Sequence, residues 1–183
     1  MPQAPCFTEL LSQAAAQAQV LEDGGVLSLA LPLAPLDPLQ ALPRMPGALR
    51  FRALWDSQPG LCFAASGVAQ QLELSGPRRF ELAQRFSQLS LSRLADTAPA
   101  APALARPRVL LAFSFFDAPL QEAADPLPGV RAVLPRWQLS RQGRHCWLRL
   151  QRCLGGEVTP RVVAEELWEQ ARRLQQLPLT PLA

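Results

Sequence analysis

The chain has 183 residues, of which 49% are hydrophobic and 18% charged, with 19 prolines and a net charge of +3. This length supports one domain with its own core, and the apolar content excludes a disordered chain. Frequent prolines favour many short elements and exclude a long helical bundle.

Four residue types are missing, namely Lys, Tyr, Ile and Asn, and all 18 basic residues are Arg. The exclusive use of Arg is better explained by a GC-rich coding bias than by nucleic-acid binding. The arginines are spread out, with only short pairs such as Arg78-Arg79, and form no dense basic stripe. We therefore expect no nucleic-acid partner. The chain also cannot supply a Lys base, a Schiff-base Lys or a Tyr proton donor.

The chain carries four cysteines and no C-x-x-C pair: Cys6, Cys62, Cys146 and Cys153. We expect reduced, mostly buried thiols in a cytoplasmic protein. The longest apolar stretch, Val26–Leu36, is too short to cross a bilayer, and the first twenty residues lack the basic start of a signal peptide. No membrane association is expected.

The first third of the chain predicts a helix followed by strands. A helix is expected over Phe7–Val20 and a strand over Val26–Leu31, followed by a proline-punctuated connection from Leu33 to Pro46. Alternation over Leu49–Trp55 predicts a half-buried strand with Phe51, Ala53 and Trp55 on one face. After the turn Ser57–Gly60, a returning strand is expected over Leu61–Ala65. Gly67 marks an unusual backbone angle or close packing.

The middle of the chain predicts a helix and then a linker. Gly76-Pro77 opens the helix, with Pro77 in its first position and a core-facing stripe of Leu82, Phe86 and Leu89. The Ala/Pro-rich segment Asp96–Pro107 predicts a surface loop.

The last third predicts strands, a hairpin and a closing helix. Strands are expected over Arg108–Phe116 and Val130–Leu139, and the turn Arg141–Arg144 joins the latter to a strand over His145–Gln151. The final helix is capped by Thr159, has Pro160 in its first turn and ends before Pro178. Its apolar stripe is Val163, Leu167, Ala171 and Leu174. Together these elements predict an α+β fold with a largely antiparallel sheet and packed helices.

No residue set supports a catalytic, cofactor-binding or metal site. Ala65-Ser66-Gly67 lacks the first Gly of a nucleophile elbow, and the lone His145 stands in a hairpin. The spacing of His145, Cys146 and Cys153 fits no common zinc motif. Three glutamates on the last helix offer Mg²⁺ ligands but are more typical of a solvated face: Glu165, Glu166 and Glu169.

Several stretches in order resemble the amino-terminal region of isochorismate synthases, with the closest similarity to cyanobacterial members. These stretches are Phe51–Trp55, Phe63–Ala69, Leu74–Phe80 with Ala83–Phe86, Pro107 with Phe113–Asp117, and Val133–Leu139. The resemblance covers Val26 to Leu177. The family's Gly-Gly before Phe113 is Leu111-Ala112 here, which puts tight packing of that strand in doubt.

The resemblance implies the amino-terminal half of the α/β sandwich of chorismate-utilising enzymes. In that family chorismate becomes isochorismate, a precursor of menaquinone, phylloquinone or salicylate, with a Lys base, a Glu acid and Mg²⁺ held by further Glu residues. All of these belong to a carboxy-terminal chorismate-binding domain. We therefore expect residues 1–183 to form a single scaffold domain without the catalytic half, and we assign no catalytic residue. The expected partner is a separately encoded catalytic domain.

Two other interpretations stay open. One is a component of anthranilate synthase, which the absence of an L-L-E-S motif near the start disfavours. The other is a stand-alone interaction module that uses this fold. A cooperatively melting, monodisperse monomer favours the module, whereas a partner-dependent chain favours the fragment.

Overall fold

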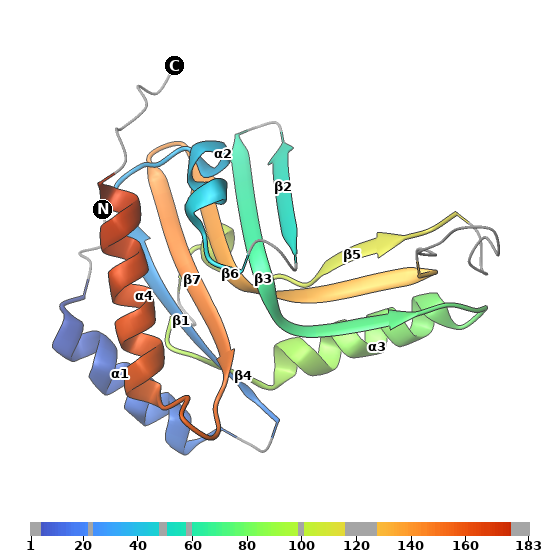
Figure 1. Cartoon of the computed structure of the whole chain (residues 1–183), viewed down its shortest axis with the longest axis horizontal. Coiled ribbons are helices and arrows are strands. Elements are labelled where there is room, and N and C mark those ends of the chain that lie inside the picture. The colour runs from blue at the N-terminus through green and yellow to red at the C-terminus, as the bar shows by residue number, and fades with distance from the viewer. Residues whose placement is uncertain are drawn as a thin grey trace.

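The computed structural model describes residues 5–21, 24–47, 51–57, 60–98, 101–115 and 128–176. Within them, one sheet has the strand order β2-β3-β6-β7-β1-β4, and β5 pairs with β6 outside this path (Figure 1). The pairs are antiparallel apart from the parallel pair β1–β4. The fold is therefore α+β with a largely antiparallel sheet, as predicted.

The elements have the following bounds: α1 Phe7–Gln19, β1 Val26–Leu33, α2 Pro38–Ala41, the 3₁₀ turn η1 Leu42–Arg44, β2 Arg52–Ser57, β3 Leu61–Leu74, α3 Arg79–Ser92, β4 Leu94–Asp96, the 3₁₀ turn η2 Ala103–Ala105, β5 Leu110–Phe113, β6 Val130–Gln142, β7 His145–Cys153 and α4 Pro160–Gln175. Among the described residues, no helix combines the length and the apolar character that crossing a membrane requires.

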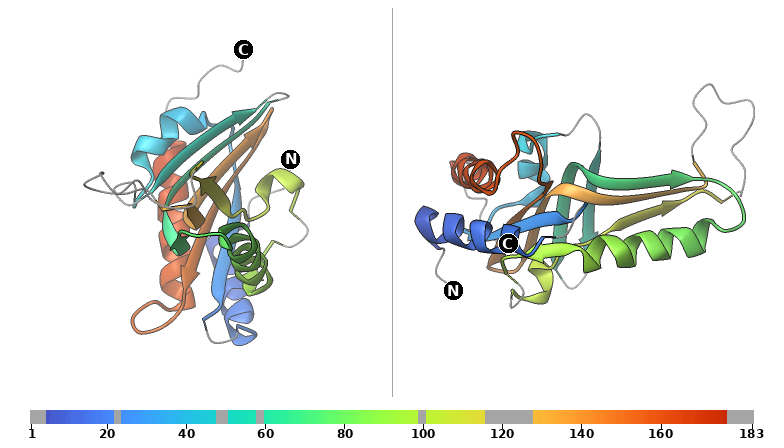
Figure 2. Two further views of the ribbon diagram at one scale, coloured as in Figure 1. Left: turned by 90° about the vertical axis from the view of Figure 1, so that its right-hand side faces the viewer. Right: turned by 90° about the horizontal axis from the view of Figure 1, so that it is seen from below.

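The two terminal helices, α1 and α4, cover one face of the sheet (Figures 1 and 2). The Thr159 hydroxyl accepts a hydrogen bond from the Val162 backbone and starts α4 as predicted. The predicted apolar stripe of α4 is buried, and it packs on alternate leucines of β1 and on Trp137 of β6. This face holds the main hydrophobic core.

The opposite face of the sheet has a polar centre around Arg149, which is 1% exposed. Its Nη1 donates to Ser28 Oγ at 2.6 Å and to Asp96 Oδ1 at 2.7 Å, and its Nε donates to the Ala105 carbonyl at 2.9 Å. Gln138 Nε2 donates to the Arg106 carbonyl at 2.8 Å. These bonds tie β6 and β7 to β1, β4 and the segment that contains η2.

The prediction of a surface loop over Asp96–Pro107 is therefore wrong. Leu104 and Ala105 are 7% and 1% exposed and lie against Ala30 and Trp147 on the sheet. The segment is held in place because its backbone carbonyls satisfy buried donors of the sheet. The donors, Gln138 and Arg149, lie far along the chain, so the Ala/Pro-rich composition of the segment does not reveal them.

Strand β3 continues to Leu74, well past the predicted end at Ala65, and bends at Gly67. Gly67 has a φ of +66°, and a Cβ there would lie 3.2 Å from the Cβ of Arg136 and 3.6 Å from the Cα of Gly47. The register with β6 shifts between Val68 and Gln70. Beyond this bulge, β3 and β6 leave the main sheet as an arm with β5 and α3 (Figure 2).

Helix α3 starts at Arg79, two residues after the predicted Pro77, and its predicted core stripe holds only in part, since Leu82 and Phe86 are half-buried. Leu89 is 45% exposed, whereas Ala83 is fully buried and Ser90 is 4% exposed. Small side chains thus face the arm, which lets the helix approach the strands closely. Hydrophobicity alone selects the longer side chains instead.

Strand β2 also departs from its prediction, since Trp55 is 66% exposed. Strand β2 is an edge strand of the sheet and pairs with β3. The face of β2 that was expected to be buried is therefore exposed to solvent at Trp55. Leu49 and Arg50 lie outside the described residues.

The four cysteines are all free. Cys146 is buried and Cys62 half-buried, but Cys6 and Cys153 are exposed, so the expectation of mostly buried thiols holds for only part of the set. Burial raises the pKa of the Cys146 thiol to about 11.

The bend at Gly67 predicts an asymmetric response to two alanine substitutions. Gly143→Ala adds a Cβ in open space at a φ of +56°, so we expect about 1–2 kcal/mol of backbone strain. Gly67→Ala adds similar strain plus crowding with Arg136, so its loss of unfolding free energy should exceed that of Gly143→Ala by about 1–3 kcal/mol. Urea unfolding of both variants measures the difference, and equal losses would contradict the close packing at the bend.

Thiol labelling at pH 8 should separate the cysteines. The exposed Cys6 and Cys153 should react quickly, and Cys146 should react only when urea unfolds the chain, because its thiolate fraction at a pKa of about 11 is small. Peptide mapping by mass spectrometry after brief labelling checks this. Labelling of Cys146 as fast as Cys153 in the native protein would show that β7 opens readily.

Candidate functional site

Residues of β2, β3, β5 and β6 line an apolar groove of about 500 Å³. Figure 1 shows the place of these strands, where the arm leaves the main sheet. The apolar lining of the groove includes Ala53, Leu54, Trp55, Phe63, Leu110 and Leu111. We call this hollow the Trp55 groove. Its size falls within the range of ligand-binding hollows.

Large apolar side chains stay open to solvent around the Trp55 groove. Trp55, Leu54 and Leu111 are 66%, 41% and 46% exposed. Such a grouping is typical of an interaction surface rather than of a finished monomer surface. Strand β2 adds a free edge, since no strand in the described residues pairs with its outer side. The groove therefore suits a partner that covers apolar surface and adds a strand.

The charged groups at the groove are mainly arginines. Arg52 and Arg131 line it, and the Arg131 guanidinium lies 5.8 Å from the Phe51 ring centroid and 2.9 Å from Glu73 Oε1. Arg108 lies 5.5 Å from the ring centroid of Phe63. Burial, and then repulsion from Arg149, lower the pKa of Arg108, yet a guanidinium keeps its charge at neutral pH. Arg131 is paired with Glu73, and Arg108 donates to the backbone carbonyls of Ala103, Leu104 and Arg106, so Arg52 is the lining arginine that best suits a carboxylate from a partner.

Ser66 and His145 do not form a nucleophile and base pair. Ser66 pairs in register with Trp137, whereas His145 pairs with Gln142, five residues further along β6 or roughly 17 Å away. The Ser66 hydroxyl donates to the Pro46 carbonyl at 2.9 Å, and His145 is exposed at the start of β7. Ser66 thus has a structural hydrogen bond, and His145 faces solvent.

No zinc site forms from the cysteines. Cys146 and Cys153 are separated along β7 by roughly 23 Å, and within the described residues no three His, Cys, Asp or Glu side chains gather as metal ligands.

The glutamates of α4 are engaged by arginines. Glu166 accepts from Arg136 and, at 3.1 Å, from Arg152. Glu165 pairs with Arg161 at 2.8 Å, and Glu169 pairs with Arg173 at 3.2 Å; each arginine lies one turn away on the same helix. A Mg²⁺ ion would have to displace these partners, so the residues do not fit a metal site.

The Trp55 groove is the feature that sequence reasoning missed. Alternation over Leu49–Trp55 correctly predicts a strand but assigns its apolar face to the core. The usable signal was the density of aromatic and apolar residues on two neighbouring strands without a helix predicted to cover them.

Comparison with known proteins finds a protein family and solved structures that the chain resembles. A family model described as chorismate binding enzyme matches residues 10–182. A solved structure, the menaquinone-specific isochorismate synthase MenF from Escherichia coli, is 19% identical with a TM-score of 0.46. The match covers 97% of this chain and 35% of that one, so the chain spans about a third of the length of MenF. No curated protein matches. The family model covers nearly the whole chain, which belongs to the family of chorismate-binding enzymes.

Proposed function

We propose that this chain is the amino-terminal scaffold half of an isochorismate synthase and is not catalytic by itself. The observation that carries the proposal is the combination of family membership with the absence of Lys from all 183 residues. The reaction needs a base to activate water, and the family resemblance implies a Lys in that role. The ordered motifs between Phe51 and Leu139 support isochorismate synthase within the family.

The proposed partner is a separately encoded chorismate-binding domain, acting with this chain in the cytoplasm. That domain would supply the Lys base, the Glu acid and the glutamates that hold Mg²⁺. The exposed Trp55, the free edge of β2 and the arginines beside them support a partner at the Trp55 groove. The Arg-paired glutamates of α4 support the assignment of Mg²⁺ to the partner rather than to this chain.

The purified chain should form no isochorismate from chorismate in the presence of Mg²⁺, because no residue of the chain can act as the Lys base. Chromatographic detection of isochorismate, with an active isochorismate synthase as the positive control, measures this. Formation of isochorismate by the pure chain, abolished when the chain is omitted, would refute the non-catalytic assignment.

Mixing the chain with a Lys-bearing catalytic domain from the same cell tests the partner assignment. Activity should require both polypeptides, and Trp55→Ser should reduce it because the variant removes the most exposed apolar contact of the groove. Leu39→Ser is a matched control, since Leu39 is 59% exposed on α2 outside the groove. Equal activity of the two variants would place the interface elsewhere.

The Trp55 groove also agrees with the alternative of a stand-alone interaction module. A partner-free chain that is monodisperse and melts cooperatively, and that restores no activity to the catalytic domain, would favour this second function. Partner-dependent folding would favour the scaffold.

A further inference from the structure

Strand β2 ends the sheet with backbone groups that point away from it. The Gly67 amide donates to the Phe51 carbonyl at 3.0 Å, so these two residues face each other as a hydrogen-bonded pair between the strands. Such pairs alternate along an antiparallel ladder, so every second residue from Phe51 onward bonds to β3. The residues between them, Arg52, Leu54 and Asp56, therefore direct their amides and carbonyls to the outer side of β2. No strand of the described residues pairs there.

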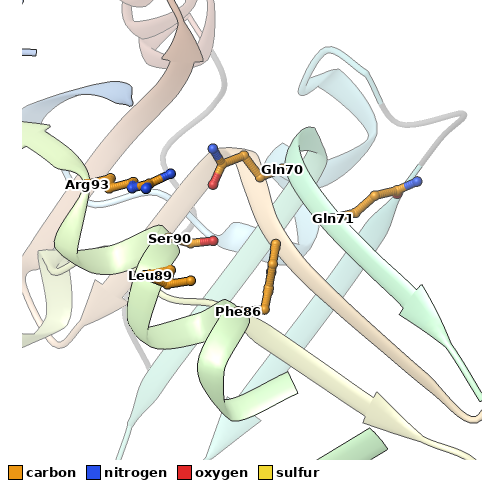
Figure 3. Close-up of a pocket in the computed structure, with 6 residues that line it drawn as sticks. All are labelled: Gln70, Gln71, Phe86, Leu89, Ser90 and Arg93. Carbon is orange, nitrogen blue, oxygen red and sulfur yellow. The ribbon is translucent and has the colours of Figure 1, made fainter. Parts of the chain in front are cut away.

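The other boundaries of the sheet are shorter or covered. Strand β4, at the opposite end, has three residues. Strand β5 has four, and the Phe113 ring stacks on Phe80 of α3 with the ring centroids 4.7 Å apart. The arm part of β3 lies beside the same helix, where Gln70 borders one hollow together with Phe86 and Ser90 (Figure 3). Within the described chain, β2 is therefore the longest edge strand that stays uncovered.

The sequence of β2 is complementary to itself when two copies run antiparallel. With Leu54 facing Leu54 of a second copy, Arg52 of each copy faces Asp56 of the other, and Ala53 of each faces Trp55 of the other. A two-fold axis between the two leucines relates the halves of this arrangement. The same register joins the backbones, because the residues with outward amides and carbonyls face one another and can exchange hydrogen bonds.

The charges of β2 select this register. Arg52 and Asp56 are exposed, and neither forms an ion pair with a described residue. They lie roughly 13 Å apart along the strand, too far to pair within one chain. Two antiparallel copies bring each guanidinium opposite a carboxylate, which stabilises a strand pair. A shift by two residues, the nearest other register that keeps the backbone bonds, faces Arg52 or Asp56 with Leu54 instead.

The apolar side chains of β2 fit the same arrangement. Leu54 and Trp55 are 41% and 66% exposed in the single chain. At the axis, the two Leu54 side chains cover each other. Each Trp55 indole packs beside the small Ala53 of the other copy, at a closely spaced pair that accommodates one large side chain. Pairing thus removes from water the apolar surface that one chain leaves exposed.

We propose that two copies of this chain associate through their β2 edges into a symmetric dimer with one continuous sheet. The inference goes beyond the proposed scaffold function and rests on β2 alone. A catalytic domain that adds a strand at this edge would displace the second copy, so the dimer is a state of the partner-free chain. One short strand pair is a small interface, so we expect a dissociation constant in the micromolar range.

Sedimentation equilibrium of the unmodified chain, from low micromolar to near-millimolar concentration, tests the dimer. The average mass should rise from that of one chain toward that of two and no further, because a two-fold contact is closed. A mass that stays at one chain throughout, or that rises past two, would overturn the proposal. Neither chorismate nor a catalytic domain is present, so failure here is distinct from failure of the proposed function.

Charge exchange locates the contact. Arg52→Asp should weaken association by about tenfold or more, because both facing pairs become two carboxylates, and Asp56→Arg should do the same with two guanidiniums. The double variant Arg52→Asp/Asp56→Arg should dimerise like the unmodified chain, and an equal mixture of the single variants should form a heterodimer. Association that the single variants leave unchanged, or that the double variant fails to restore, would contradict the β2 contact.

A substitution at the axis provides an independent measurement. Leu54→Lys places two like charges face to face and should abolish the dimer, as lysine does on the edge strands of natural sheets. Leu39→Lys is the matched control, since Leu39 is 59% exposed on α2 and lies outside the β2 edge. Both side chains are exposed, so circular dichroism should show melting like that of the unmodified chain. Equal loss of association in the two variants would place the contact elsewhere.

Discussion

The bend of β3 at Gly67 is the constraint on which the rest of the structure depends. The pair β3–β6 belongs to the main sheet on one side of the bend and to the arm on the other. Glycine is favoured there, because the backbone is left-handed and a Cβ would lie only 3.2 Å from the Cβ of Arg136. The Trp55 groove lies in the angle that the arm makes with β2. This surface is therefore a consequence of one local distortion of β3.

Local signals predicted the elements that are stabilised by nearby residues. The β6–β7 hairpin and α4 follow directly from alternation, a cap at Thr159 and a regular apolar stripe. The segment around η2 was mistaken for a surface loop because its stability comes from Arg149, 44 residues after Ala105 in the chain. The surfaces at Trp55 and Leu89 were missed for a related reason: apolar periodicity identifies a face but not whether another element covers it. The order of the predicted helices and strands was enough to predict the fold class, whereas the candidate surfaces required coordinates.

The charges of the chain explain why it resembles a scaffold more than an active site. The three glutamates of α4, which offer potential metal ligands, are paired with arginines, and Glu166 contacts both Arg136 and Arg152. An ion pair of this kind occupies the carboxylate oxygens that a metal would need. Arginine cannot replace the missing Lys as a base, because its guanidinium does not release a proton at physiological pH. These contacts agree with the proposed scaffold role, in which a partner supplies the chemistry.

Two arginines show how burial decides what the same side chain does. Arg149 is buried and donates to acceptors from β1, β4 and η2, so its charge holds distant segments together. Arg93 is exposed, and its backbone amide and carbonyl, rather than its guanidinium, join α3 to the sheet. A buried charge must be neutralised by the protein for folding to succeed, whereas an exposed charge is solvated by water. The structural contribution of each arginine is therefore set by its burial and not by its residue type.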